Sequence, residues 1–80
     1  NMGMTIEQCR AARALLGWSA NTLAEAAKLG IATVKRFEAG QVVQEASVTA
    51  LQTSLDEAGI EFFEAGEVSR KGGAGVRLKA

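Results

Sequence analysis

Residues 19–40 read Ser-Ala-Asn-Thr-Leu-Ala-Glu-Ala-Ala-Lys-Leu-Gly-Ile-Ala-Thr-Val-Lys-Arg-Phe-Glu-Ala-Gly, and they predict two short helices joined by a tight turn. The first helix carries Leu23 and Ala24 on one side, where the small alanine lets a second helix approach closely. In the second helix, Val34 and Phe37 are three residues apart and therefore share one helical face. The two apolar faces predict helices that pack against each other.

Capping residues and glycines mark the ends of the predicted helices. Thr5-Ile-Glu-Gln8 forms a capping box, which begins a helix that runs to about residue 16 and stops at Gly17. Ser19 is the expected cap of the second helix. Gly30 lies in the turn before the third helix, where a reversal of the chain favours a residue without a Cβ atom.

The second half of the chain changes from helical to strand periodicity. A fourth helix is expected at about 46–58, with an apolar stripe at a spacing of three to four residues. Residues 60–64 and 75–79 then read as short strands, and the glycine-rich segment 66–73 connects them as a hairpin loop. Two strands alone are marginal in water, so the hairpin must pack on the helices or pair with another subunit.

Composition indicates one small domain with charge of opposite sign in its two halves. The chain has 80 residues, 48% of them hydrophobic, and a net charge of zero. Residues 1–40 hold five basic and three acidic side chains, whereas residues 41–80 hold four basic and six acidic ones. Positive charge therefore collects around the second and third helices, although nucleic-acid-binding domains usually have a net basic charge.

The residue content argues against several kinds of chemistry. Cys9 is the single cysteine, histidine is absent, and no second cluster of metal ligands is evident, so no metal or other cofactor is expected. The carboxylates have no nucleophile beside them, so catalysis is not expected either. The lone cysteine, with no 18-residue apolar run and no signal peptide, predicts a cytoplasmic protein without a membrane partner.

An ordered set of residues between positions 8 and 40 carries a family resemblance. The set comprises Arg13, Gly17, Trp18, Ser19, Leu23, Ala24, Thr33, Val34, Arg36, Phe37, Glu38 and Gly40. It resembles the phage-repressor and Cro-like (XRE-like) helix-turn-helix family. The later runs Leu55-Asp-Glu-Ala-Gly-Ile-Glu-Phe62 and Gly75-Val-Arg-Leu78 are similar to small stand-alone bacterial members.

The resemblance implies a fold class and a division of the chain. The expected fold is mainly α, with a four-helix phage-repressor-like helix-turn-helix core at 5–59. A short β-hairpin at 60–80 follows as a dimerisation tail. In this family the third helix enters the major groove of DNA.

Eight residues are expected to face double-stranded DNA: Ser19, Asn21, Lys28, Ile31, Ala32, Thr33, Lys35 and Arg36. The resemblance places Arg36 on the groove side, where its guanidinium can bond guanine O6 and N7, while Lys35 is expected to meet a phosphate. Ile31 and Ala32 stand where the family often has polar base-reading residues and offer only apolar contact, for example to a thymine methyl group. Thr33 either bonds a phosphate or covers the turn.

The second helix departs from the family pattern. Ala20 and Thr22 stand where many members carry glutamine and glutamate, so phosphate contacts fall to the Ser19 hydroxyl, Asn21 and the helix N-terminus. Lys28 replaces a frequent glycine, and a glycine replaces the frequent serine cap two residues later.

Arg13 and Glu38 are expected to be structural. Each lies at an otherwise core-facing position of its helix, and the two charges are opposite. The pattern and the resemblance both predict a partly buried ion pair between them.

These observations predict a sequence-specific DNA-binding regulator, acting as a repressor and as a homodimer. Two other functions stay open: an antitoxin that also neutralises a partner toxin, and a helix-turn-helix-derived module that binds proteins instead of DNA. The zero net charge and the alanine and isoleucine at positions 20 and 31 favour the last of these.

Overall fold

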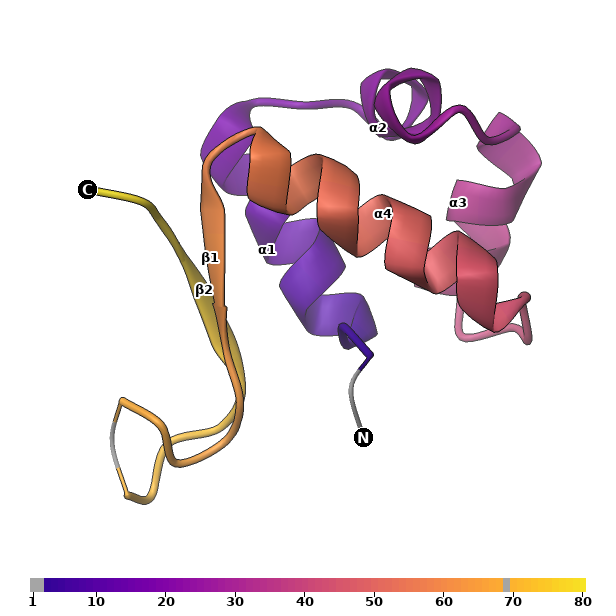
Figure 1. Cartoon of the computed structure of the whole chain (residues 1–80). Helices are drawn as coiled ribbons and strands as arrows, with labels where there is room; N and C mark the ends of the chain where they lie inside the picture. The colour runs from indigo at the N-terminus through magenta and orange to yellow at the C-terminus, as the bar shows by residue number, and fades with distance from the viewer. Residues whose placement is uncertain (1–2, 69) are drawn as a thin grey trace.

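The computed structural model describes residues 3–68 and 70–80, in which four α-helices precede an antiparallel pair of strands (Figure 1). The elements are α1 (Ile6–Leu16), α2 (Ala20–Ala27), α3 (Ile31–Glu38), α4 (Glu45–Glu57), β1 (Ile60–Phe63) and β2 (Gly75–Leu78). The chain is therefore mainly α with a C-terminal hairpin, as predicted. α4 lies one residue earlier than predicted, and each strand ends one residue earlier.

The first two helices begin and end where their sequence signals place them. The Thr5 hydroxyl accepts a hydrogen bond from the Gln8 N–H at 3.0 Å, and the Gln8 side chain accepts one from the Thr5 N–H at 2.9 Å. Gly17 ends α1 in the left-handed conformation, with φ 69°. The Ser19 hydroxyl caps α2 by accepting from the Thr22 N–H at 3.1 Å.

The turn between α2 and α3 corrects the expectation for Gly30. Its φ is −71°, which any residue can adopt, and the space where a Cβ would lie is open. The left-handed residue is instead Lys28, with φ 59° and ψ 42°, and it is the only non-glycine residue of positive φ in the described chain. The reversal occurs here because the Leu29 N–H bonds back to the Ala24 carbonyl at 2.9 Å and closes the end of α2.

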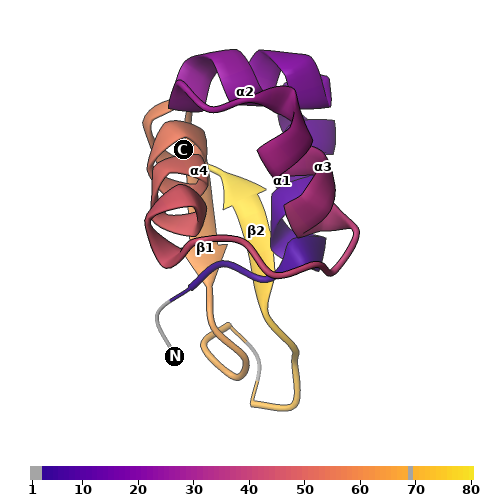
Figure 2. The same cartoon turned by 90° about the vertical axis from the view of Figure 1, so that its right-hand side faces the viewer.

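A single core joins all six elements, whose arrangement is seen in Figure 2. Its fully buried residues are Cys9 and Ala12 from α1, Leu23 from α2, Val34 from α3, Leu51 and Leu55 from α4, and Ile60 from β1. Trp18 packs against this core from the α1–α2 connection but is only partly buried. Because α2, α3 and α4 meet in the same core, α3 has a fixed inner face and a free outer face.

The hairpin packs on the helices through one of its two faces. Ile60 pairs with Leu78 and Phe62 with Val76, and Phe62 and Val76 both contact the core. Phe63 lies on the opposite face, where the Arg77 guanidinium stands 4.6 Å from the centre of its ring. One ring is therefore covered by the core and the other by a cation of its own hairpin.

Gln8 connects α1 to the loop end of the hairpin. Its side-chain N–H groups donate to the Phe63 carbonyl at 2.8 Å and to the Gly75 carbonyl at 3.0 Å. The same side chain accepts from Thr5 in the capping box, and the residue is 6% exposed. One buried amide thus holds both the start of α1 and the last pair of the ladder.

Candidate nucleic-acid interface

The outer face of α3 carries two unpaired basic side chains. Val34 and Phe37 are buried against the other helices, so Lys35 and Arg36 point away from the core and are exposed. Within residues 3–68 and 70–80, neither side chain has an ion-pair partner. Both cations are therefore available to a ligand.

The first turn of α3 presents apolar groups beside these cations. Ala32 is exposed, whereas Ile31 is half-buried and packs against the core. Thr33 is also half-buried. Ala32 and Arg36 are four residues apart, so they lie on the same exposed stripe of the helix.

α2 and its two ends carry the remaining predicted residues. Asn21 is exposed in the first turn of α2. The Ser19 hydroxyl accepts from the Thr22 amide and lies 3.0 Å from the Thr22 hydroxyl, so it is engaged in the cap. Lys28 is exposed at the C-terminal end of α2, in the turn that leads to α3.

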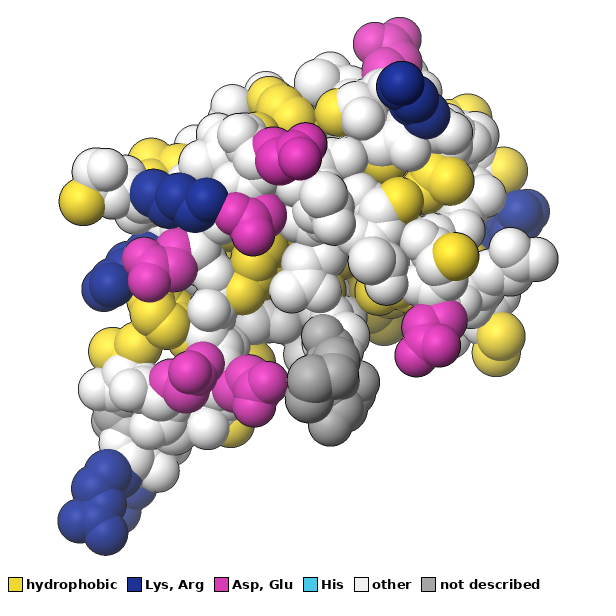
Figure 3. Space-filling model, viewed as in Figure 1, with side chains coloured by type: hydrophobic (Ala, Val, Ile, Leu, Met, Phe, Trp, Pro, Cys, Tyr) yellow, Lys and Arg dark blue, Asp and Glu magenta, His cyan; other side chains and the backbone are white. Residues whose placement is uncertain are grey.

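Charge around α2 and α3 is predominantly positive. The side chains of Lys28, Lys35 and Arg36 are free of ion pairs in the described part of the chain, while Glu25 is an exposed acid on α2. The other acid, Glu38, is paired with Arg13. Figure 3 shows basic side chains on the α2–α3 side of the molecule, at the right, with an acidic side chain beside the upper ones, and a second set of basic side chains over the hairpin, at the left.

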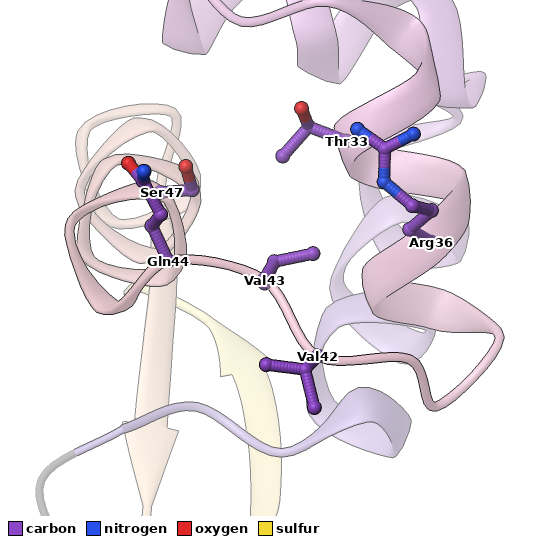
Figure 4. Close-up of a pocket in the computed structure, with 6 residues that line it drawn as sticks. All are labelled: Thr33, Arg36, Val42, Val43, Gln44 and Ser47. Atoms are coloured by element: carbon purple, nitrogen blue, oxygen red, sulfur yellow. The ribbon is translucent and has the colours of Figure 1, made fainter.

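A hollow between α3 and the start of α4 extends this surface (Figure 4). It has a volume of about 520 Å³ and is lined by Thr33, Arg36, Val42, Val43, Gln44 and Ser47. Val42 is 96% exposed at its rim. The sequence-based site contained Thr33 and Arg36 but none of the other four, because their position beside α3 depends on how the α3–α4 connection and the start of α4 fold back.

An ion pair fixes α3 to α1. The structure places Arg13 and Glu38, which the sequence pairs, in two-pronged contact: Nη2 to Oε1 at 2.7 Å and Nε to Oε2 at 2.9 Å. Arg13 Nη1 also donates to the Trp18 carbonyl at 3.1 Å. The Cys9 thiol donates to Glu38 Oε2 at 3.2 Å, a contact that the sequence did not predict.

The environment of this cluster shifts its ionisation. Burial tends to raise the pKa of Glu38, but the hydrogen bonds from Arg13 and Cys9 and the Arg13 charge outweigh it and lower that pKa. Burial, with the hydrogen bond to Glu38, raises the pKa of Cys9 to about 12. A protonated, buried thiol is a poor nucleophile, so Cys9 acts here as a third donor to Glu38.

The described residues can also be compared with what a metal site or a membrane-spanning helix requires. No set of three or more Cys, Asp and Glu side chains that could hold a metal ion occurs in residues 3–68 and 70–80. The same residues contain no helix with the length and apolar character needed to cross a membrane. No protein-family model and no curated protein sequence matches the chain.

Proposed function

We propose that the chain is a sequence-specific DNA-binding regulator, a repressor, that reads the major groove with the outer face of α3. The observation that carries this proposal is the pair of free cations, Lys35 and Arg36, on a helix whose inner face is fixed in the core. A recognition helix needs this combination, because base reading requires a rigid helix and an unengaged donor.

The form of α2 and α3 supports the proposal. Both helices have eight residues, and the segment 28–30 between them has the three-residue length typical of a helix-turn-helix. In this arrangement α2 crosses the phosphate backbone. Asn21 at its start and Lys28 at its end are exposed and can contact phosphates there.

The strained backbone of Lys28 gives independent support. A non-glycine residue in the left-handed conformation costs roughly 1–2 kcal/mol, and glycine would avoid that cost. A lysine at this position brings a cation to the joint of the two helices at the expense of stability. Strained residues tend to occur where function needs a particular side chain.

The hollow beside α3 supplies polar side chains that can contact the phosphate backbone of DNA. Thr33, Gln44 and Ser47 stand around the same space as the Arg36 guanidinium (Figure 4). Hydroxyl and amide side chains make many of the phosphate contacts in protein–DNA complexes. In our proposal Arg36 bonds a guanine, Lys35 meets a phosphate, and a homodimer presents two α3 helices about 34 Å apart.

Binding to a random duplex library over a series of salt concentrations tests the proposal. Arg36→Ala should weaken binding to the selected site by about 5–150-fold and relax one base preference. Lys35→Ala should weaken binding to all DNA sequences alike and reduce the slope of log K against log salt by about 1. Arg70→Ala, which removes an exposed arginine from the hairpin loop, is the matched control and should bind like the parent.

Protein binding is the second candidate function, and one observation favours it. Val42 exposes almost its whole side chain at the rim of the hollow, which suits an apolar partner as well as DNA sugar. Affinity for duplex DNA that does not change with salt, or that is unchanged in both α3 variants, would favour this candidate and contradict DNA reading by α3.

A further inference from the structure

We infer that α3 reads a 5-methylpyrimidine, either thymine or 5-methylcytosine, close to a guanine, so that cytosine methylation increases binding. This inference rests on the proposed function and names the base pattern that α3 recognises. It follows from one juxtaposition: an exposed side chain that can form no hydrogen bond, Ala32, beside the free guanidinium of Arg36.

The two side chains lie close together on the outer face of α3. Residues four apart on a helix have Cβ atoms roughly 5–6 Å from each other. The helix rises about 6 Å over that interval, whereas base pairs are about 3.4 Å apart. Ala32 and Arg36 therefore reach bases that are one or two pairs apart. Ile31 packs against the core and Thr33 lines the hollow, so Ala32 is the exposed apolar side chain of this turn.

Charge complementarity makes duplex DNA the suitable occupant of this face. Lys28, Lys35 and Arg36 are unpaired within the described chain, and Glu38, the acid of α3, is occupied by Arg13. A guanidinium without an internal partner bonds guanine through O6 and N7 in the major groove. A base one or two pairs from this guanine then meets the methyl group of Ala32.

The chemistry of Ala32 determines which bases it accepts. In the major groove, thymine presents O4 and a C5-methyl group, and cytosine presents an N4 amino group. 5-Methylcytosine adds the same C5-methyl group to the cytosine pattern. An alanine methyl contacts the C5-methyl but bonds neither O4 nor N4, so it treats thymine and 5-methylcytosine alike. Uracil and unmodified cytosine lack the methyl and lose the contact.

Single substitutions in a selected binding site test the inference. Each thymine is replaced in turn by deoxyuridine, which removes only the methyl group. At one position, within two base pairs of the guanine that depends on Arg36, binding should weaken about fourfold, the value of one buried methyl-sized group. Replacing that thymine–adenine pair by a 5-methylcytosine–guanine pair should preserve binding better than a cytosine–guanine pair does, by a similar factor.

Two protein variants assign the effect to the right residue. Ala32→Gln keeps helix propensity but should remove the difference between thymine and deoxyuridine. Ala14→Gln, at an exposed alanine of α1, is the matched control and should keep the difference. A deoxyuridine effect that persists in Ala32→Gln would overturn the inference.

The experiment also separates this inference from the function on which it rests. Sequence-specific binding with equal affinity for thymine and deoxyuridine at every position would overturn methyl reading and leave the DNA-binding proposal standing. Selection of no binding site from the random library would overturn the proposed function, and the inference with it.

Discussion

Gln8→Glu tests whether the buried amide that joins α1 to the hairpin matters for stability. The substitution preserves the size of the side chain and its oxygen acceptor for the Thr5 N–H. It removes both N–H groups that donate to the carbonyls of Phe63 and Gly75, at 2.8 Å and 3.0 Å. A carboxylate would then face two carbonyl oxygens in a site that is 6% exposed in the parent.

The expected loss follows from these contacts. Two neutral hydrogen bonds contribute about 1–3 kcal/mol, and leaving their acceptors opposite a negative charge adds to the penalty. A carboxylate in the first turn of α1 regains about 0.3–1 kcal/mol from the helix dipole. The net decrease in the free energy of unfolding should be about 2–3 kcal/mol. The free energy of unfolding of an 80-residue domain is about 4–12 kcal/mol, so the expected decrease is a large share of it.

Urea and thermal unfolding, followed by circular dichroism, measure the effect. The melting temperature should fall by about 10–20 °C. Gln41→Glu is the control, because it makes the same chemical change at an exposed loop position and should be nearly neutral. The deficit of Gln8→Glu relative to the parent should shrink at low pH, because a protonated carboxyl group can again donate one hydrogen bond. Equal stability of Gln8→Glu and the control would refute the reasoning.

Three further changes probe the helices around the candidate interface. Lys28→Gly should raise the free energy of unfolding by about 0.5–1 kcal/mol, because relief of the left-handed strain exceeds the entropy cost of glycine; a lower urea midpoint would contradict this. Arg13→Ala should lower the free energy of unfolding by about 2–4 kcal/mol, since it leaves the carboxylate of Glu38 without its ion-pair partner (the side chains of Arg13 and Glu38 are 21% and 12% exposed). Arg10→Ala removes an exposed charge that acts on Glu38 without a direct contact, so its effect should be much smaller. Similar melting temperatures for the two variants would count against a structural ion pair. Because the folded-state pKa of Glu38 is lowered, the pair stabilises the fold above the ordinary value of 4.5, and this contribution is lost as the pH falls through the folded-state pKa. Urea titrations across that range should show a weaker pH dependence in Glu38→Gln than in the parent.

Local signals in the sequence predicted the helix ends well. The capping box, the glycine after α1 and the serine before α2 each act within four residues, so they can be read without knowledge of the fold. The turn before α3 was misassigned because glycine is the usual sign of a left-handed residue. Here the chain places a lysine in that conformation two residues earlier. The family resemblance, in which glycine is frequent at position 28, pointed to this residue, whereas the residue type alone did not.

Contacts between distant segments were harder to predict. The amide of Gln8 reaches residues 55 and 67 positions away, and nothing near it in the sequence marks a second role. The hollow beside α3 includes Gln44 and Ser47, which look like ordinary residues at the start of α4. The face of α3 was predictable because helical periodicity separates Val34 and Phe37 from the exposed cations.

α1 connects the candidate interface to the hairpin through adjacent residues. Gln8 bonds the loop end of the hairpin, and Cys9, the next residue, bonds Glu38 of α3. Arg13, one turn later, makes the stronger contact to the same carboxylate. If a second subunit docks on the hairpin, which the family resemblance makes the expected dimerisation tail, α1 is a rigid element that relates its position to α3. The spacing of two recognition helices would then depend on α1, because α1 contacts both the hairpin and α3. Loss of the Gln8 anchor should therefore affect binding to a two-half-site operator more than binding to a single half-site.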